Sequence, residues 1–203
     1  EIMPSLVGSE MCIRDRVRRV RHAVYAGSPA QKDLILPFLD AVAKRNEKQV
    51  DIIADIVGVS NEQVMALMKI SAPEQNAIIA YGRIPHEKCI EIVKMADFSV
   101  LLRENLRYAK AGFSTKLSES LSLGVPVLCN SVGGADEIIQ DGQNGIKVEG
   151  CNTNTIIAAL DRIISLSDGE IDDLKRSALN TGKHLFDGSA YVAVLNDAVN
   201  GLI

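Results

Sequence analysis

The chain of 203 residues is long enough for one domain with a single hydrophobic core. Its 47% hydrophobic and 24% charged residues are typical of a globular protein and exclude the disordered and fibrous classes. The 22 basic and 26 acidic side chains give a formal net charge of −4, which lends no support to nucleic-acid binding.

The cysteine pattern and the hydropathy of the chain exclude two further classes of protein. The four cysteines stand far apart without a C-x-x-C pair, so we expect reduced thiols and neither a disulfide framework nor a zinc site. No apolar run approaches the roughly 18 to 20 residues that span a bilayer. We therefore expect a soluble cytoplasmic protein, with at most peripheral contact at the inner face of a membrane.

The first sixteen residues, EIMPSLVGSEMCIRDR, do not match the rest of the chain. They show neither helical nor strand periodicity, and they lack the three regions of a signal peptide. They closely resemble translated sequencing-adaptor text, so we interpret residues 1–16 as non-native rather than as a native disordered extension. On this interpretation the reading frame was cut here, and we expect an upstream domain to be missing.

Apolar β-rich runs alternate with helical patterns from about residue 20 onward. Strands are expected at 22–27, 50–58, 76–81, 98–103, 125–130 and 145–148. Helices are expected at 32–44, 61–69, 86–95, 114–123, 136–140, 153–166, 169–185 and 187–202. Pro37 should kink the first helix or mark its real start, and Ser60 or Asn61 should cap the second.

This alternation predicts an α/β fold with a Rossmann-like, mainly parallel sheet and helices on both faces. We expect residues 17–203 to form one such domain. Ligands of these sheets bind at the carboxyl ends of the strands. The loops that would build a site there are 26–33, 58–61, 81–86, 103–116 and 130–136.

The residues from Gly112 to Glu119 (GFSTKLSE) form the strongest candidate site. Ser114 or Thr115 can cap a helix whose N-terminus offers free amides and a partial positive charge to a phosphate. Lys116 adds a full charge in the first turn. The Glu119 carboxylate, one turn further on, can accept hydrogen bonds from two ribose hydroxyls. This spacing fits a nucleoside diphosphate, although an ordinary capped surface helix with a Lys–Glu pair has the same spacing.

A resemblance to a known family favours the nucleotide. The stretch AGFSTKLSESLSLGVPVLCN (111–130), followed by GGADEIIQDGQNGIKV (133–148), resembles the group 1 (family four) retaining glycosyltransferases, in particular bacterial polysaccharide-biosynthesis members. Further matches are Tyr25-Ala26-Gly27 with Lys32, Gly82-Arg83-Ile84-Pro85, and Ala96-Asp97-Phe98-Ser99-Val100. The resemblance covers residues 20 to 200 and implies the C-terminal, nucleotide-sugar-binding half of a GT-B fold.

The resemblance also assigns roles to individual residues. Glu119 would hold the ribose of the donor, and the loop 82–85 would contact the base, with Ile84 using its backbone. Lys32 and Lys116 would act as catalytic groups that stabilise the charge of the diphosphate leaving group. The donor-binding residues would be Gly27, Ile84, Thr115, Lys116, Leu117 and Glu119.

The implied reaction transfers a hexose from a nucleotide-diphosphate sugar to a glycan or lipid-linked acceptor, with retention of configuration. The sequence shows no D-x-D-like motif, so we expect neither a metal ion nor another cofactor. The acceptor site would come from the missing N-terminal domain across a cleft. This chain alone should then bind the donor weakly and transfer little sugar.

Two departures from the family pattern keep other functions open. Ala111 stands where the family has the first glutamate of its Glu-x7-Glu motif, and Ser28 stands where an arginine commonly follows the glycine. One alternative is a sugar-nucleotide epimerase of the same fold. The others are a non-catalytic nucleotide-sugar-binding relative and a flavodoxin-like interaction domain.

Overall fold

The computed structural model describes residues 19–28, 33–104, 106–107, 112–192, 196–197 and 199. The expectation for residues 1–16, the role of Lys32 and the departure at Ala111 all lie outside these residues.

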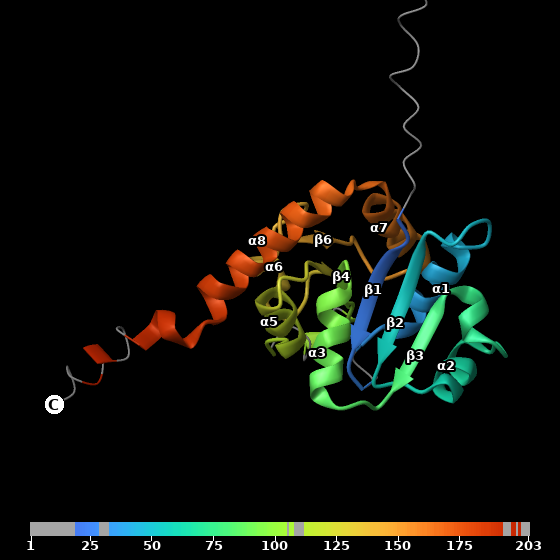
Figure 1. Cartoon of the computed structure of the whole chain (residues 1–203), viewed down its shortest axis with the longest axis horizontal. Helices are drawn as coiled ribbons and strands as arrows, with labels where there is room; N and C mark the ends of the chain where they lie inside the picture. Colours follow the sequence, from blue (N-terminus) through green and yellow to red (C-terminus); the bar gives the residue numbers. More distant parts are fainter. Residues whose placement is uncertain are drawn as a thin grey trace, which may run out of the picture.

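The described chain is built on a six-stranded parallel sheet (Figure 1). The strands are β1 (Arg21–Ala26), β2 (Ile52–Val57), β3 (Ile78–Gly82), β4 (Phe98–Leu101), β5 (Val127–Cys129) and β6 (Gly145–Lys147). Their order is β3-β2-β1-β4-β5-β6, the doubly wound order of dinucleotide-binding folds. The predicted α/β, Rossmann-like parallel sheet is therefore confirmed.

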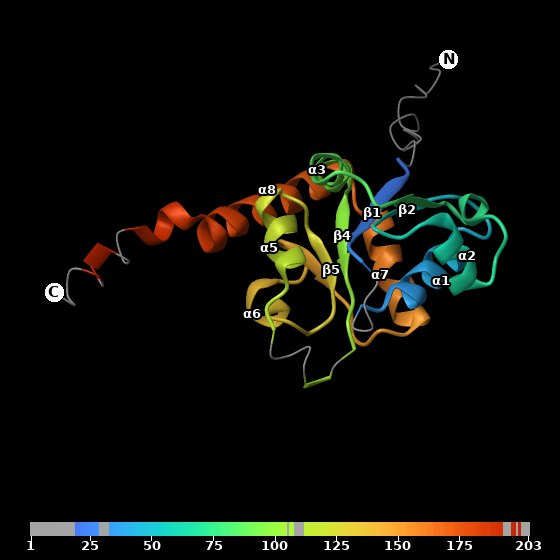
Figure 2. The same ribbon diagram turned by 90° about the horizontal axis from the view of Figure 1, so that it is seen from below.

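Helices cover both faces of this sheet (Figure 2). One face carries α1 (Ile35–Arg45), α2 (Asn61–Met68) and α7 (Thr153–Ser165). The other carries α3 (His86–Met95), α5 (Thr115–Ser122), α6 (Ala135–Ile138) and α8 (Asp168–Phe186). A 3-10 turn, η1 (Pro73–Asn76), precedes β3, and α8 continues beyond the sheet toward the C-terminus (Figure 1).

The strands form because short apolar runs are buried on both sides, as a covered parallel sheet requires. The core between the sheet and the helices α1 and α7 includes the fully buried Phe38, Ile56 and Phe98. Not every buried strand residue is apolar. Asp55 of β2 is buried, and its carboxylate accepts a hydrogen bond from Tyr81 Oη at 2.9 Å and lies 2.7 Å from His22 Nδ1.

The helix boundaries agree with the predicted ones to within about three residues. Pro37 lies in the first turn of α1, so it marks a helix start rather than a kink. Ser60 caps α2 in a capping box with Gln63. Of the expected helix 187–202, the structure describes the 3-10 turn η2 (Gly188–Tyr191) and helical backbone at Val192, Asn196, Asp197 and Val199. Within the described residues, no helix is both long and apolar enough to cross a membrane.

Candidate functional site

The site begins where the strand order reverses. The chain leaves β3 at one edge of the sheet and re-enters it at β4, next to β1, so the loops after β1 and β4 diverge there. Such a switch point opens a crevice at the carboxyl ends of the strands. Gly27 follows β1 and Gly58 follows β2, and a Cβ atom on Gly58 would lie 2.8 Å from the carbonyl carbon of Gly27. The two loops can therefore approach each other closely because Gly58 carries no side chain.

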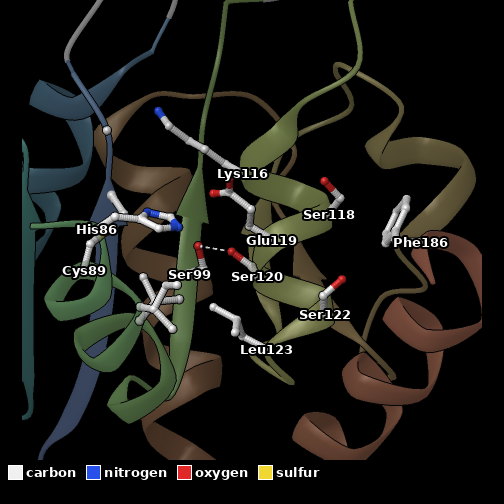
Figure 3. Close-up of a pocket in the computed structure, with 14 residues that line it drawn as sticks. His86, Cys89, Ser99, Lys116, Ser118, Glu119, Ser120, Ser122, Leu123 and Phe186 are labelled. Carbon is white, nitrogen blue, oxygen red and sulfur yellow. Dashed lines mark hydrogen bonds between the residues drawn. The ribbon is translucent and has the colours of Figure 1, made fainter. Parts of the chain in front are cut away.

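A cavity of about 470 Å³ lies beside this point, between α3 and α5 (Figure 3). Its α3 side includes His86 and Cys89, and its α5 side includes Lys116 and Glu119. The remaining lining residues are Ala26, Gly27, Ile90, Val93, Ser99, Ser118, Ser120, Ser122, Leu123 and Phe186. The cavity thus joins the end of β1 to one face of α5.

Helix α5 starts one residue later than predicted, at Thr115, with Ser114 in the N-cap position. The side chain of Ser114 does not cap the helix. Its hydroxyl is buried and has no hydrogen-bond partner among the described residues. The backbone carbonyl of Ser114 accepts instead from Leu117 N at 3.0 Å. The expected side-chain cap at Ser114 is therefore wrong, and the helix start relies on its backbone alone.

Lys116 does not extend into solvent from the first turn of α5. Its ammonium donates to the Asp33 carboxylate and to Tyr25 Oη, which lies 3.1 Å away. It also lies 4.3 Å from the centroid of the Tyr25 ring, within the range of a cation–π contact. The side chain crosses Gly27, where a Cβ atom would lie 2.5 Å from Lys116 Nζ. Lys116 is thus held at the end of β1.

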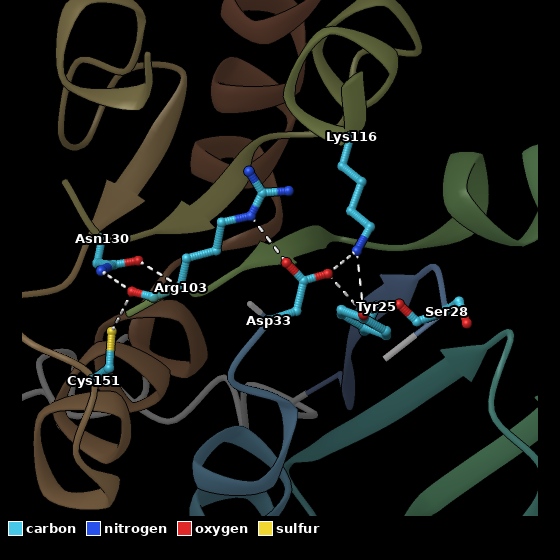
Figure 4. Close-up of polar contacts among 7 residues, drawn as sticks. All are labelled: Tyr25, Ser28, Asp33, Arg103, Lys116, Asn130 and Cys151. Carbon is cyan, nitrogen blue, oxygen red and sulfur yellow. Dashed lines mark hydrogen bonds and ion pairs between the residues drawn. The ribbon is translucent and has the colours of Figure 1, made fainter. Parts of the chain in front are cut away.

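Asp33 accepts hydrogen bonds from three side chains at this end of the sheet (Figure 4). Its carboxylate accepts from Arg103 Nε at 2.9 Å and from Tyr25 Oη at 2.9 Å, in addition to Lys116. Burial of Asp33 raises its pKa, but the hydrogen bond and charge of Lys116, with the hydrogen bonds from Arg103 and Tyr25, outweigh it. The net result is a pKa below the usual value. Burial and the negative Asp33 raise the pKa of the Tyr25 hydroxyl, so Tyr25 stays a neutral donor.

Glu119 lies one turn after Lys116 on α5. Its side chain is directed toward α3, whereas that of Lys116 extends toward the end of β1 (Figure 3). Its charge acts across the cavity: burial, and then the Glu119 carboxylate, raise the pKa of the Cys89 thiol. A carboxylate here can accept two hydroxyl hydrogen bonds from a ligand in the cavity.

The predicted donor-binding residues fall into three groups. Gly27, Lys116 and Glu119 line the cavity together. The side chain of Leu117 is fully buried in the core, which leaves only its backbone for a ligand, and the side chain of Ile84 is partly buried against the core. Thr115 is exposed at the start of α5 and is not among the residues that line the cavity.

Sequence reasoning missed two charged residues of the site, Asp33 and Arg103. Asp33 directly follows the predicted Lys32, and Arg103 ends the predicted strand FSVLLR. Both lie in loops at the carboxyl ends of strands, which is the signal that could have identified them.

Comparison with known proteins decides the family. A model of the family described as "Glycosyl transferases group 1" matches residues 24–181. The chain belongs to this family. This group 1 chain is 30% identical over 116 residues to an uncharacterized glycosyltransferase of Methanocaldococcus jannaschii. That match covers 57% of this chain but only 28% of the relative.

Solved structures show the same fold. The group 1 chain is similar to the C-terminal domain of a group 1 family glycosyl transferase (LpcC) from Francisella tularensis, with a TM-score of 0.63 and 20% identity. That match covers 82% of this chain and 86% of the other. It is also similar to Anabaena HepE in complex with UDP-glucose, with a TM-score of 0.68 and 15% identity, over 90% of this chain and 49% of the other. The chain therefore spans about half of that protein, in agreement with the C-terminal half of a GT-B fold.

Proposed function

We propose that this chain is the donor-binding half of a glycosyltransferase that moves a hexose from a nucleotide-diphosphate sugar to a glycan or lipid-linked acceptor. One observation carries the proposal. Lys116 and Glu119 lie one turn apart on α5, at the switch point of the sheet, and line the same 470 Å³ cavity as Gly27. A cation at the helix start and a carboxylate one turn further match a phosphate next to a ribose.

In this arrangement the diphosphate lies against Gly27 and the N-terminus of α5. Gly27 has no side chain, so the phosphate can approach the backbone closely. As the bond to the sugar breaks, negative charge grows on the diphosphate, and a fixed cation lowers the barrier most at that moment. Lys116 supplies this charge, and we assign the same role to Lys32. We further propose that no metal ion or other cofactor takes part and that configuration is retained.

The nucleoside occupies the cavity between α3 and α5. The Glu119 carboxylate accepts hydrogen bonds from the two ribose hydroxyls. Backbone groups of the loop that holds Ile84 contact the base. The backbone of Thr115 and Leu117 contacts phosphate. Anabaena HepE, a protein of the same fold, was solved with UDP-glucose, so UDP is the first nucleotide to test.

The acceptor site belongs, in this proposal, to an N-terminal domain that the present chain does not include. GT-B enzymes assemble the reacting groups from two domains, so this chain alone binds donor and transfers little sugar. We also place the complete enzyme in the cytoplasm, with at most peripheral contact at the inner membrane face.

One observation keeps a sugar-nucleotide epimerase as the second candidate. His86 lies across the cavity from Glu119, and a histidine with a carboxylate is a common acid–base pair. The two functions separate on product analysis of the complete enzyme. A transferase releases nucleoside diphosphate only when an acceptor is present, whereas an epimerase converts the sugar nucleotide without acceptor.

Calorimetry with UDP, GDP and ADP tests the proposal. We expect one of the three to bind at millimolar concentration or better and Lys116→Ala to weaken that binding at least tenfold, the loss of one hydrogen bond to a charged group. Lys183→Ala, on the exposed surface of α8, is the matched control and should change nothing. Binding of none of the three nucleotides would contradict the assignment.

A further inference from the structure

A buried carboxylate joins two cationic side chains at the carboxyl end of β1. Asp33 Oδ1 accepts from Arg103 Nε at 2.9 Å, and Asp33 Oδ2 accepts from both Lys116 Nζ and Tyr25 Oη (Figure 4). The Asp33 side chain is only 4% exposed, so water competes little for these bonds. Each carboxylate oxygen therefore already has a strong donor.

Arg103 is fixed at both its backbone and its side chain. Asn130 Oδ1 accepts from Arg103 N at 3.0 Å, and Asn130 Nδ2 donates to Arg103 O at 2.7 Å. The guanidinium uses Nε for Asp33, and its two terminal nitrogens point away from that carboxylate (Figure 4). Arg103 also lines a second cavity of about 1030 Å³ at the carboxyl ends of β4 to β6.

The charges of this cluster do not cancel. One carboxylate faces one ammonium and one guanidinium, so Asp33, Lys116 and Arg103 together carry a formal charge of +1. Two largely buried cations without a carboxylate between them would repel each other and separate. Removal of the Asp33 carboxylate would therefore raise the positive charge of the cluster, but Lys116 and Arg103 would no longer be held in place.

Building on the proposed function, we infer that Asp33 is a positioning residue, which holds Lys116 and Arg103 as a cationic pair that receives the diphosphate of the donor. The positioning role and the negative charge of Asp33 predict opposite effects of its removal on anion binding. If Asp33 acted only through its negative charge, its removal would strengthen the binding of an anion. If Asp33 positions the cations, its removal weakens binding, and most strongly for the ligand with two phosphates.

Calorimetry with UDP and UMP on four proteins separates these outcomes. We expect Asp33→Asn to weaken the binding of UDP about tenfold and the binding of UMP less. The affinity for UDP relative to that for UMP therefore falls. Asp33→Glu, which keeps the charge, should recover part of this ratio. Asp161→Asn is the matched control, because it makes the same charge change at the exposed Arg45 pair on the other side of the molecule. Tighter UDP binding by Asp33→Asn, or equal losses for UDP and UMP, would overturn the inference.

A second measurement does not depend on nucleotide binding. Reductive methylation with ¹³C-formaldehyde keeps the charge of lysines, and loss of one NMR signal in Lys116→Arg identifies Lys116. We expect this signal to lie apart from those of exposed lysines and to join them in Asp33→Asn; an unchanged signal overturns the inference even if UDP binds. If no nucleotide binds but the signal moves, the proposed function fails while the contact between Asp33 and Lys116 stands. Should Asp33→Asn not fold, Arg103→Lys replaces it in the calorimetry, and an unchanged ratio there overturns the inference.

Discussion

The side chain of Lys116 crosses directly over Gly27, so closely that a Cβ atom on Gly27 would lie 2.5 Å from Lys116 Nζ. The two residues are far apart in sequence, and they meet because α5 begins beside the end of β1. The absence of a side chain at Gly27 is therefore what allows the ammonium to reach Tyr25 and Asp33.

We predict that Gly27→Ala displaces the end of Lys116 and weakens nucleoside diphosphate binding about tenfold, the value expected for loss of a charged hydrogen bond. The atoms in the way belong to a flexible side chain, so stability should change less than binding. Gly142→Ala, which lies in open space at a positive φ of 75°, reports the effect of backbone strain alone. Calorimetry and thermal unfolding of both variants test this, and unchanged affinity in Gly27→Ala would contradict it.

We predict that Glu119 acts on the ribose and not as a catalytic acid or base. Glu119→Gln should lose roughly 1.5 to 3 kcal/mol of binding free energy for the ribonucleotide, because two hydroxyls lose a charged acceptor. The 2′,3′-dideoxynucleotide lacks those hydroxyls, so its affinity should hardly change. Calorimetry with both nucleotides compares the two losses. Equal losses would place the carboxylate elsewhere, and loss of turnover without loss of donor affinity in the complete enzyme would make Glu119 a catalytic group.

We predict a pH-dependent contribution of Asp33 to stability. Its pKa is lower in the folded protein than its usual value of about 3.9. Its stabilising effect is therefore complete above about pH 4 and is lost as the pH falls through the folded-state pKa. Guanidinium unfolding should show a deficit of about 3 kcal/mol for Asp33→Asn at pH 7, as expected when one partner of a buried pair is removed. The deficit should narrow below pH 4, and a constant deficit would contradict the assignment of this ion pair.

The sequence predicted the sheet because its signal is local. Each strand is a short apolar run, and each helix carries its own periodicity and caps, as Ser60 with Gln63 shows in α2. The position of Glu119 one turn after Lys116 is equally local, since helical geometry alone fixes it. These features needed no knowledge of how the elements pack.

The cluster around Asp33 could not be predicted in this way. Asp33 and Lys116 are 83 residues apart, and Asp33 and Arg103 are 70 residues apart. Their meeting depends on β1 and β4 lying side by side, which periodicity does not determine. The missing cap at Ser114 has a similar origin, because the fold buries its hydroxyl. Propensity places a serine at a helix start but does not determine its hydrogen bonds.

The last prediction concerns the packing that holds α5 in place. Gly182 of α8 lies against the end of α5, where a Cβ atom would be 2.5 Å from the carbonyl oxygen of Leu121 and 2.6 Å from Ser122 N. These are backbone atoms of a helix, so no side-chain rotation relieves the clash. Gly182→Ala would gain about 1 kcal/mol of helix propensity, but overpacking of this kind costs about 1 to 3 kcal/mol.

We therefore expect Gly182→Ala to lower the free energy of unfolding by about 1 kcal/mol, the balance of these two effects. Gly169→Ala is the matched control, since Gly169 lies in the same helix with no atom near its missing Cβ. It should stabilise the protein by several tenths of a kcal/mol, because alanine restricts the unfolded chain. Chemical denaturation measures both changes. Because α5 carries Lys116 and Glu119, Gly182→Ala should also weaken UDP binding, whereas Gly169→Ala should not. A Gly182→Ala variant that is more stable than the wild type would show that α5 and α8 can separate freely.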